Sequence, residues 1–159
     1  MTSITIAAIT GAGVVTGLLF AFSNFVMQAL AMLPKEQGMF AMQQINEKII
    51  NPIFLAFFLG TPILCAIVAV NAFIALGSPG NVFLLVGSIS YLVGPFGITM
   101  LFNVPLNNRL AAAEIRDADG IWSDYQVRWQ RWNHVRTCIG IVSIVLLAAG
   151  LAEGVAGRM

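Results

Sequence analysis

The segment Trp129-Gln130-Arg131-Trp132-Asn133-His134-Val135-Arg136-Thr137 stands directly before fifteen residues without a charge, Cys138 to Ala152. A helix needs roughly 20 apolar residues to cross the hydrocarbon core of a bilayer. Fifteen are too few, so we expect the helix to draw residues before Cys138 into the membrane boundary. His134 and Arg136 would then lie at the edge of the bilayer, where ionisable groups are costly and indicate a functional site by default.

The composition of the whole chain also indicates a membrane protein. Among its 159 residues, 58% are hydrophobic and 9% are charged, against roughly 45–50% and about 25% in soluble domains. So little charge cannot cover a water-exposed surface. The length suits one domain. The net charge of +1 gives no basic field, so we expect no nucleic-acid partner and take the lipid bilayer as the main surrounding of the chain.

Four apolar segments predict four membrane spans, over residues 4–33, 52–76, 82–102 and 134–155. Between the first two, residues 35–50 carry apolar side chains at helical spacing among charged ones, which is typical of a short helix at the membrane interface. Asn51-Pro52 is a favoured start for the second span, because asparagine caps helices and proline suits their first position.

The fourth span is expected to extend out of the membrane, because no Gly or Pro occurs between Ile121 and Ile139. The predicted fold is therefore all-α: an integral membrane four-helix bundle with a short interfacial helix after the first span and a long fourth helix. Residues 1–159 would form a single four-span membrane domain.

The basic residues predict an orientation. The loops 34–51 and 103–137 fall on the same side of a four-span protein, and they carry seven of the eight Lys and Arg residues. The positive-inside rule then places both loops in the cytoplasm and both termini outside. We expect the membrane to be a bacterial inner membrane.

Polar side chains gather at one end of this predicted bundle. Antiparallel helices would bring together the end of the first span, the start of the second, the exit of the third and the start of the fourth. These positions hold Asn24, Asn46, Asn51, Asn103, Asn107, Asn108, Asn133, His134 and Arg136. An amide inside an apolar span needs a hydrogen-bond partner, because an unpaired one in lipid costs several kcal/mol.

An aromatic face leads into the fourth span. Its residues follow 3, 4, 3, 4 spacing and so share one side of a helix: Trp122, Tyr125, Trp129, Trp132 and Arg136. They could form an interfacial aromatic belt with basic anchors, the wall of a pocket for a flat apolar ligand, or a surface for a partner protein. A metal site is the least expected use, since one histidine without a nearby thiol or carboxylate is a poor ligand set, although a haem could take a single axial histidine.

Several sequence blocks resemble the DUF1772, or anthrone oxygenase-like, family, in the same order and over nearly the whole chain. They are Phe22-Ser23-Asn24-Phe25-Val26-Met27, Ile45-Asn46 with Asn51-Pro52-Ile53-Phe54, Phe102-Asn103-Val104-Pro105-Leu106-Asn107, and Trp132-Asn133-His134-Val135-Arg136-Thr137 with Trp129. The resemblance implies a small four-span membrane protein. It also implies an oxygenase-like activity, because some fungal members oxidise an anthrone to an anthraquinone with molecular oxygen and without a bound cofactor.

The matched residues suit such chemistry, in which a base removes an acidic C–H proton and the resulting oxyanion reacts with oxygen. We predict His134 as the base, because imidazole titrates near neutrality. Arg136, Asn103 and Asn107 are predicted to stabilise the oxyanion. The residues predicted to bind the substrate are Asn24, Trp129, Trp132 and Asn133, the tryptophans by stacking on its rings.

An alternative remains open at this stage. The same polar end could dock a partner, which would make the chain a non-catalytic structural or accessory membrane subunit. The substrate, the presence of a haem or metal, and assembly into a homo-oligomer also stay open.

Overall fold

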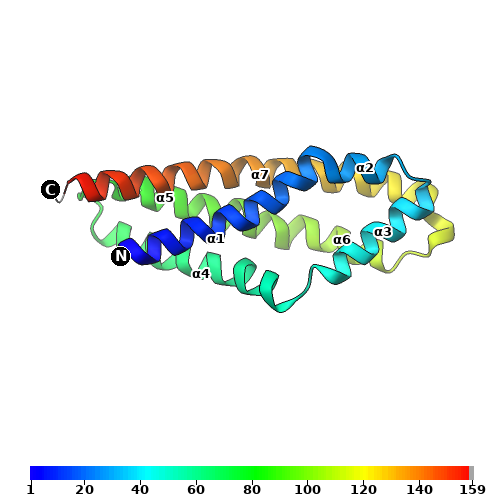
Figure 1. Cartoon of the computed structure of the whole chain (residues 1–159), viewed down its shortest axis with the longest axis horizontal. Coiled ribbons are helices and arrows are strands. Elements are labelled where there is room, and N and C mark those ends of the chain that lie inside the picture. The colour runs from blue at the N-terminus through cyan, green and yellow to red at the C-terminus, as the bar shows by residue number, and fades with distance from the viewer. Residues whose placement is uncertain (158–159) are drawn as a thin grey trace.

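The computed structural model describes residues 1–157, and within them every regular element is a helix. Four helical segments are long and apolar enough to cross a membrane: Thr2–Ala31, Pro52–Ile74, Asn81–Ala111 and Ile115–Ala156. They run along one another in an elongated bundle, with both termini at one end (Figure 1). The predicted all-α membrane bundle is therefore confirmed.

Two of the four segments are interrupted by wider, π-helical turns. The first consists of α1 (Thr2–Ala21), the π-helical turn η1 (Phe22–Val26) and α2 (Met27–Ala31). The third consists of α5 (Asn81–Tyr91), the π-helical stretch η2 (Leu92–Asn103) and α6 (Val104–Ala111). The second is α4 (Pro52–Ile74), and the fourth joins η3 (Ile115–Asp117) to α7 (Ala118–Ala156).

The interfacial helix and the long fourth helix are both present. Helix α3 (Lys35–Lys48) packs beside the first turns of α7, where Lys35 Nζ pairs with Asp119 Oδ1 at 2.8 Å. Helix α7 has 39 residues, so it is about 58 Å long at 1.5 Å per residue. Because a hydrocarbon core is roughly 30 Å thick, a large part of α7 protrudes, and Figure 1 shows α3 beside the protruding end.

Local sequence explains where the second helix begins. The side-chain oxygen of Asn51 accepts a hydrogen bond from the backbone N–H of Phe54 at 3.0 Å, and Pro52 occupies the first turn. This is the predicted asparagine cap, which satisfies one of the free N–H groups at the helix start.

Pro95 has a clear role in the wide stretch η2. Proline has no N–H to donate and its ring crowds the preceding turn, so a membrane helix around it must satisfy the freed carbonyl groups in another way. Wider turns and Ser or Thr side chains do this. Here η2 supplies the wider turns, while the Thr99 hydroxyl bonds back to the Pro95 carbonyl four residues earlier. The structure thus accommodates the proline by widening the helix.

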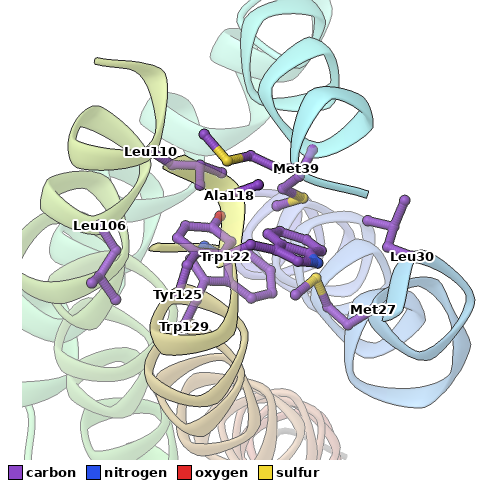
Figure 2. Close-up of a cluster of buried hydrophobic side chains, with 10 residues drawn as sticks. Met27, Leu30, Met39, Leu106, Leu110, Ala118, Trp122, Tyr125 and Trp129 are labelled. Carbon is purple, nitrogen blue, oxygen red and sulfur yellow. The ribbon is translucent and has the colours of Figure 1, made fainter. Parts of the chain in front are cut away.

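The protruding end has its own hydrophobic core, centred on Trp122. Trp122 of α7 is 1% exposed, and Met27 of α2, Met39 of α3 and Leu110 of α6 pack around it. Figure 2 shows these side chains converging. A Cβ atom on Gly38 would lie 2.7 Å from the Leu30 carbonyl oxygen and 3.1 Å from Trp122 Nε1. Glycine therefore lets α3 approach this core closely.

Candidate functional site

The polar centre of the molecule is Arg136, which is only 4% exposed. Its Nε and Nη2 atoms donate to Asn133 Oδ1 at 3.1 and 2.8 Å. Its Nη1 atom donates to Thr99 Oγ1 at 2.6 Å, and the guanidinium carbon lies 5.1 Å from the centre of a Trp129 ring. We call Arg136, Asn133, Thr99, Ser23, Asn103 and Trp129 the arginine cluster.

No carboxylate among residues 1–157 forms an ion pair with Arg136; the ion pairs in this part of the chain join exposed side chains. A buried charge is costly unless it is paired or well hydrogen-bonded. Here neutral oxygens and the face of an aromatic ring stabilise the cation in place of an anion. The cluster therefore carries a net positive charge inside the bundle.

Asn133 ties this cation to the first span. It is fully buried, and its Nδ2 donates to the Leu19 carbonyl at 2.9 Å and to Ser23 Oγ at 2.7 Å. Ser23 belongs to η1, and its hydroxyl also lies 3.3 Å from Thr137 Oγ1. The Asn133 side chain thus donates through its nitrogen to the first span and accepts through its oxygen from Arg136.

Asn103 and Asn107, the predicted site asparagines of the third segment, contact α7 nearer its start than Asn133. Asn103 is 1% exposed and its Nδ2 donates to the Trp129 carbonyl at 3.2 Å. Asn107 Oδ1 accepts from the Tyr125 hydroxyl at 2.9 Å, and this hydroxyl accepts from Asn46 Nδ2 at 3.4 Å. Asn103 therefore belongs to the arginine cluster, because it bonds to Trp129. Asn107 belongs to a separate polar group with Tyr125 and Asn46.

Trp129 and Trp132, the tryptophans predicted to bind the substrate, differ in their surroundings. Trp129 is 3% exposed and meets Phe22 edge-on at 5.5 Å between ring centres. Trp132 is only partly buried and stacks on Phe102, with ring centres 3.8 Å apart and planes 12° apart. Trp122, Tyr125, Trp129 and Arg136 do share a buried face of α7, as their spacing predicts.

His134 and Asn24 are not brought into the cluster, although the sequence placed both at the same polar end. His134 lies on the exposed side of α7, because it precedes Arg136 by two residues and so points about 200° away around the helix. Asn24 is exposed as well, while the neighbouring Ser23 turns inward to Asn133. Within residues 1–157 neither side chain has a hydrogen-bond partner in the cluster.

Sequence reasoning did not single out Thr99, Ser23 or Thr137 as site residues. Each is a small hydroxyl in an apolar setting, and such groups usually bond back to their own helix. Thr99 follows this pattern too, because its hydroxyl bonds back to the Pro95 carbonyl, and only the structure shows that it also accepts from Arg136. The inward turn of Ser23 depends on the wide turn η1, whose sequence contains neither Gly nor Pro.

The cluster has hydrogen-bonding capacity that the protein itself does not use. Three of the five N–H donors of Arg136 are occupied. Trp129 Nε1 and Asn103 Oδ1 are buried without a partner among the described residues. Buried polar groups are almost always paired. A cation with spare donors beside an unpaired indole N–H can bind a small anionic oxygen, whereas the unpaired amide oxygen of Asn103 can only accept from an O–H group of a ligand.

Comparison with known proteins identifies a matching family. The family model described as anthrone oxygenase matches residues 54–146, which is more than half of the chain. The matched range includes Thr99, Asn103, Trp129, Asn133 and Arg136, whereas Ser23 and Asn24 lie outside it. No curated protein and no solved structure matches the chain.

Proposed function

The chain belongs to the anthrone oxygenase family, and from this premise we propose that it oxidises a lipophilic, anthrone-like aromatic compound with molecular oxygen. The observation that carries the proposal is the buried cation of Arg136, which has hydrogen-bond donors to spare and no carboxylate partner within residues 1–157. Such a group stabilises an oxyanion strongly, because it is fixed in place and shielded from water.

In the proposed reaction Arg136 holds the oxygen of the substrate. Loss of a C–H proton from the CH2 group opposite the ketone, across the central ring, gives an anion whose negative charge rests mainly on that oxygen. The electron-rich ring carbon then forms a bond to molecular oxygen, and the peroxide takes up a proton. Breaking the O–O bond expels water with the remaining hydrogen of that carbon, so anthrone and oxygen give anthraquinone and water.

The positive charge of Arg136 would promote ionisation of the substrate. A positive charge within hydrogen-bond distance lowers the pKa of an acid. A bound anthrone would therefore give up its C–H proton more readily, to a water molecule at the ring carbon that lies away from the dry Arg136 site. The sequence favoured His134 for that task, but its exposed position on α7 argues against contact with a ligand at Arg136. Trp129 Nε1 and Asn103 Oδ1 are the further groups proposed to contact the ligand.

A non-catalytic role is the second candidate, and one observation favours it. Asn133 of the fourth span donates hydrogen bonds to Leu19 and Ser23 of the first span. Arg136 of the fourth span donates to Thr99 of the third, so side-chain hydrogen bonds join three spans near the same depth. Interhelical hydrogen bonds of this kind stabilise membrane bundles by about 0.6 kcal/mol each on average. An accessory subunit could retain the cluster for that purpose alone.

We also propose the membrane setting that the basic residues predict. Loops 34–51 and 103–137 would face the cytoplasm of a bacterial inner membrane, and both termini would lie outside. Helix α3 and the start of α7 would then stand on the cytoplasmic side. A lipophilic substrate would be taken from the bilayer.

Oxygen uptake tests the enzyme against the accessory subunit. The wild-type protein in lipid nanodiscs is supplied with anthrone, and oxygen consumption is compared with empty nanodiscs, which report spontaneous oxidation. We expect the protein to consume one oxygen molecule per anthraquinone formed and the Arg136→Gln variant to consume far less. Equal rates with wild-type protein and with empty nanodiscs would reject anthrone oxidation and favour the accessory role.

A further inference from the structure

Side chains of α1 and of α4 with its cap line a groove, and Figure 1 shows these two helices diverging along the bundle. Its volume is about 580 Å³, and it is lined by Val14, Val15, Leu18, Asn51, Ile53, Phe54 and Phe57. The lining is apolar except for Asn51, whose amide is already engaged in capping α4 and in bonds to the carbonyls of Lys48 and Ile49. We call this the Phe57 groove.

Aromatic rings continue from the groove into the bundle. Phe54 stacks on Phe58 with ring centres 5.4 Å apart and planes 14° apart. Phe58 then meets Phe96 of η2 at 5.5 Å. Val15 and Leu19 of α1 complete the same cluster. The inner wall of the groove is therefore formed by ring faces and branched side chains, which attract flat apolar molecules.

The same wall borders the arginine cluster on its other side. The Leu19 carbonyl accepts a hydrogen bond from Asn133, the residue that orients Arg136. Phe96 stands three residues before Thr99, whose hydroxyl accepts from Arg136. One layer of side chains, made of Leu19, Phe58 and Phe96, thus separates the groove from the cluster.

We propose that the Phe57 groove is where the substrate leaves the bilayer and docks. The occupant is an uncharged, fused-ring aromatic ketone or phenol, held by its ring faces against the layer of side chains that separates the groove from Arg136. This inference rests on the proposed function and names its route of access. Ile53 and Val14 at the mouth are 73% and 48% exposed, and in a four-span bundle such exposed apolar groups face lipid. A molecule dissolved in the bilayer therefore meets the groove directly.

The groove predicts which ligands are bound. A flat fused-ring molecule covers Phe54, Phe57 and the inner wall at once, whereas a single-ring phenol covers only part of them. Binding of the large ligand should depend on Phe57, and binding of the small one should depend on it little. Phe73 on the same helix provides a matched control, because it is a phenylalanine 67% exposed and outside the groove lining.

The test uses full-length protein in nanodiscs, with wild type, Phe57→Ala and Phe73→Ala. Binding of 1,8-dihydroxyanthraquinone and of phenol is measured by quenching of tryptophan fluorescence, and the KM for anthrone by oxygen uptake. We expect Phe57→Ala to weaken anthraquinone binding and raise the KM about fivefold or more, because the variant loses the ring face on which the ligand packs. Phe73→Ala should change both less than twofold, and phenol binding should change less than twofold in either variant.

The outcomes separate the two proposals. If wild-type protein oxidises anthrone but both variants leave binding and KM unchanged, or change them equally, the groove is not the docking site and the proposed function stands. If Phe57→Ala weakens phenol and anthraquinone equally, the groove does not select fused rings and the inference is wrong. If wild-type protein neither binds anthraquinone nor exceeds empty nanodiscs in oxygen uptake, the proposed function fails and the inference fails with it.

Discussion

Two nitrogen atoms of Arg136, Nε and Nη2, donate to a single oxygen, Oδ1 of Asn133. The amide nitrogen of Asn133 in turn donates to the first span. One asparagine therefore fixes the direction of the buried cation and joins it to another helix. Whatever binds at Arg136 meets a guanidinium group that is already oriented, which is what electrostatic stabilisation of an anion requires.

Replacement of Asn133 should destabilise the protein. Asn133→Leu removes the oxygen that accepts two hydrogen bonds from Arg136, and a buried hydrogen bond to a charged group contributes about 1.5–3 kcal/mol. We expect a clear fall in the thermal unfolding temperature in mild detergent. Asn24→Leu is the control, because Asn24 is exposed and no described residue bonds it. An equal fall in both variants would show that the bonds to Asn133 are not what stabilises the bundle.

Thr99 should act as a positioning residue for Arg136. Thr99→Val keeps the shape and removes the oxygen that accepts from Nη1, so the guanidinium can turn away. We expect the kcat for anthrone to fall about tenfold, a modest share of what loss of a direct oxyanion donor costs, with little change in KM. Thr99→Ser restores the hydroxyl and should restore most of the rate. A Thr99→Ser variant as slow as Thr99→Val would contradict this role.

His134→Ala should retain oxygen uptake within about twofold of wild type, if Arg136 ionises the ligand through its positive charge. His134 is exposed on the opposite side of α7. The measurement is the pH profile of kcat, which should keep its shape in the variant. Loss of activity with intact folding would return the histidine to the role of base that the sequence suggested.

A pair of glycines tests how the helices pack. A Cβ atom at Gly140 would lie 2.6 Å from Thr16 Oγ1 and 3.0 Å from Pro95 Cγ, so Gly140→Ala should destabilise by about 1–3 kcal/mol through overpacking. At Gly17 a Cβ meets nothing within 4 Å, and Gly17→Ala should be neutral or stabilising, because alanine favours helix by up to about 1 kcal/mol. Thermal unfolding in detergent measures both. A destabilised Gly17→Ala would indicate that this face packs against a second copy of the chain.

The sequence predicted the membrane bundle well, because apolar length, the Asn51-Pro52 cap and the uninterrupted run before Ile139 are local features. It also identified Asn133, Arg136, Asn103 and Trp129 as polar or aromatic groups near one end. It could not say which of them face inward. In the wide turn η1 Ser23 faces inward and Asn24 stays outside. The turn contains no Gly or Pro, so its sequence does not predict the widening. Resemblance to a family likewise marks His134 without giving the direction of its side chain.

The ionisation of a bound phenol tests the role of Arg136 most directly. The absorption spectrum of 1,8-dihydroxyanthraquinone in nanodiscs with the wild-type protein is titrated with pH and compared with Arg136→Gln and Arg136→Lys. Because a neighbouring cation favours the charged form of an acid, the pKa of the bound phenol should be lower with wild type than with Arg136→Gln by about one unit or more, and Arg136→Lys should recover part of that difference. The same pKa in all three proteins, with ligand bound in each, would contradict an oxyanion site at Arg136.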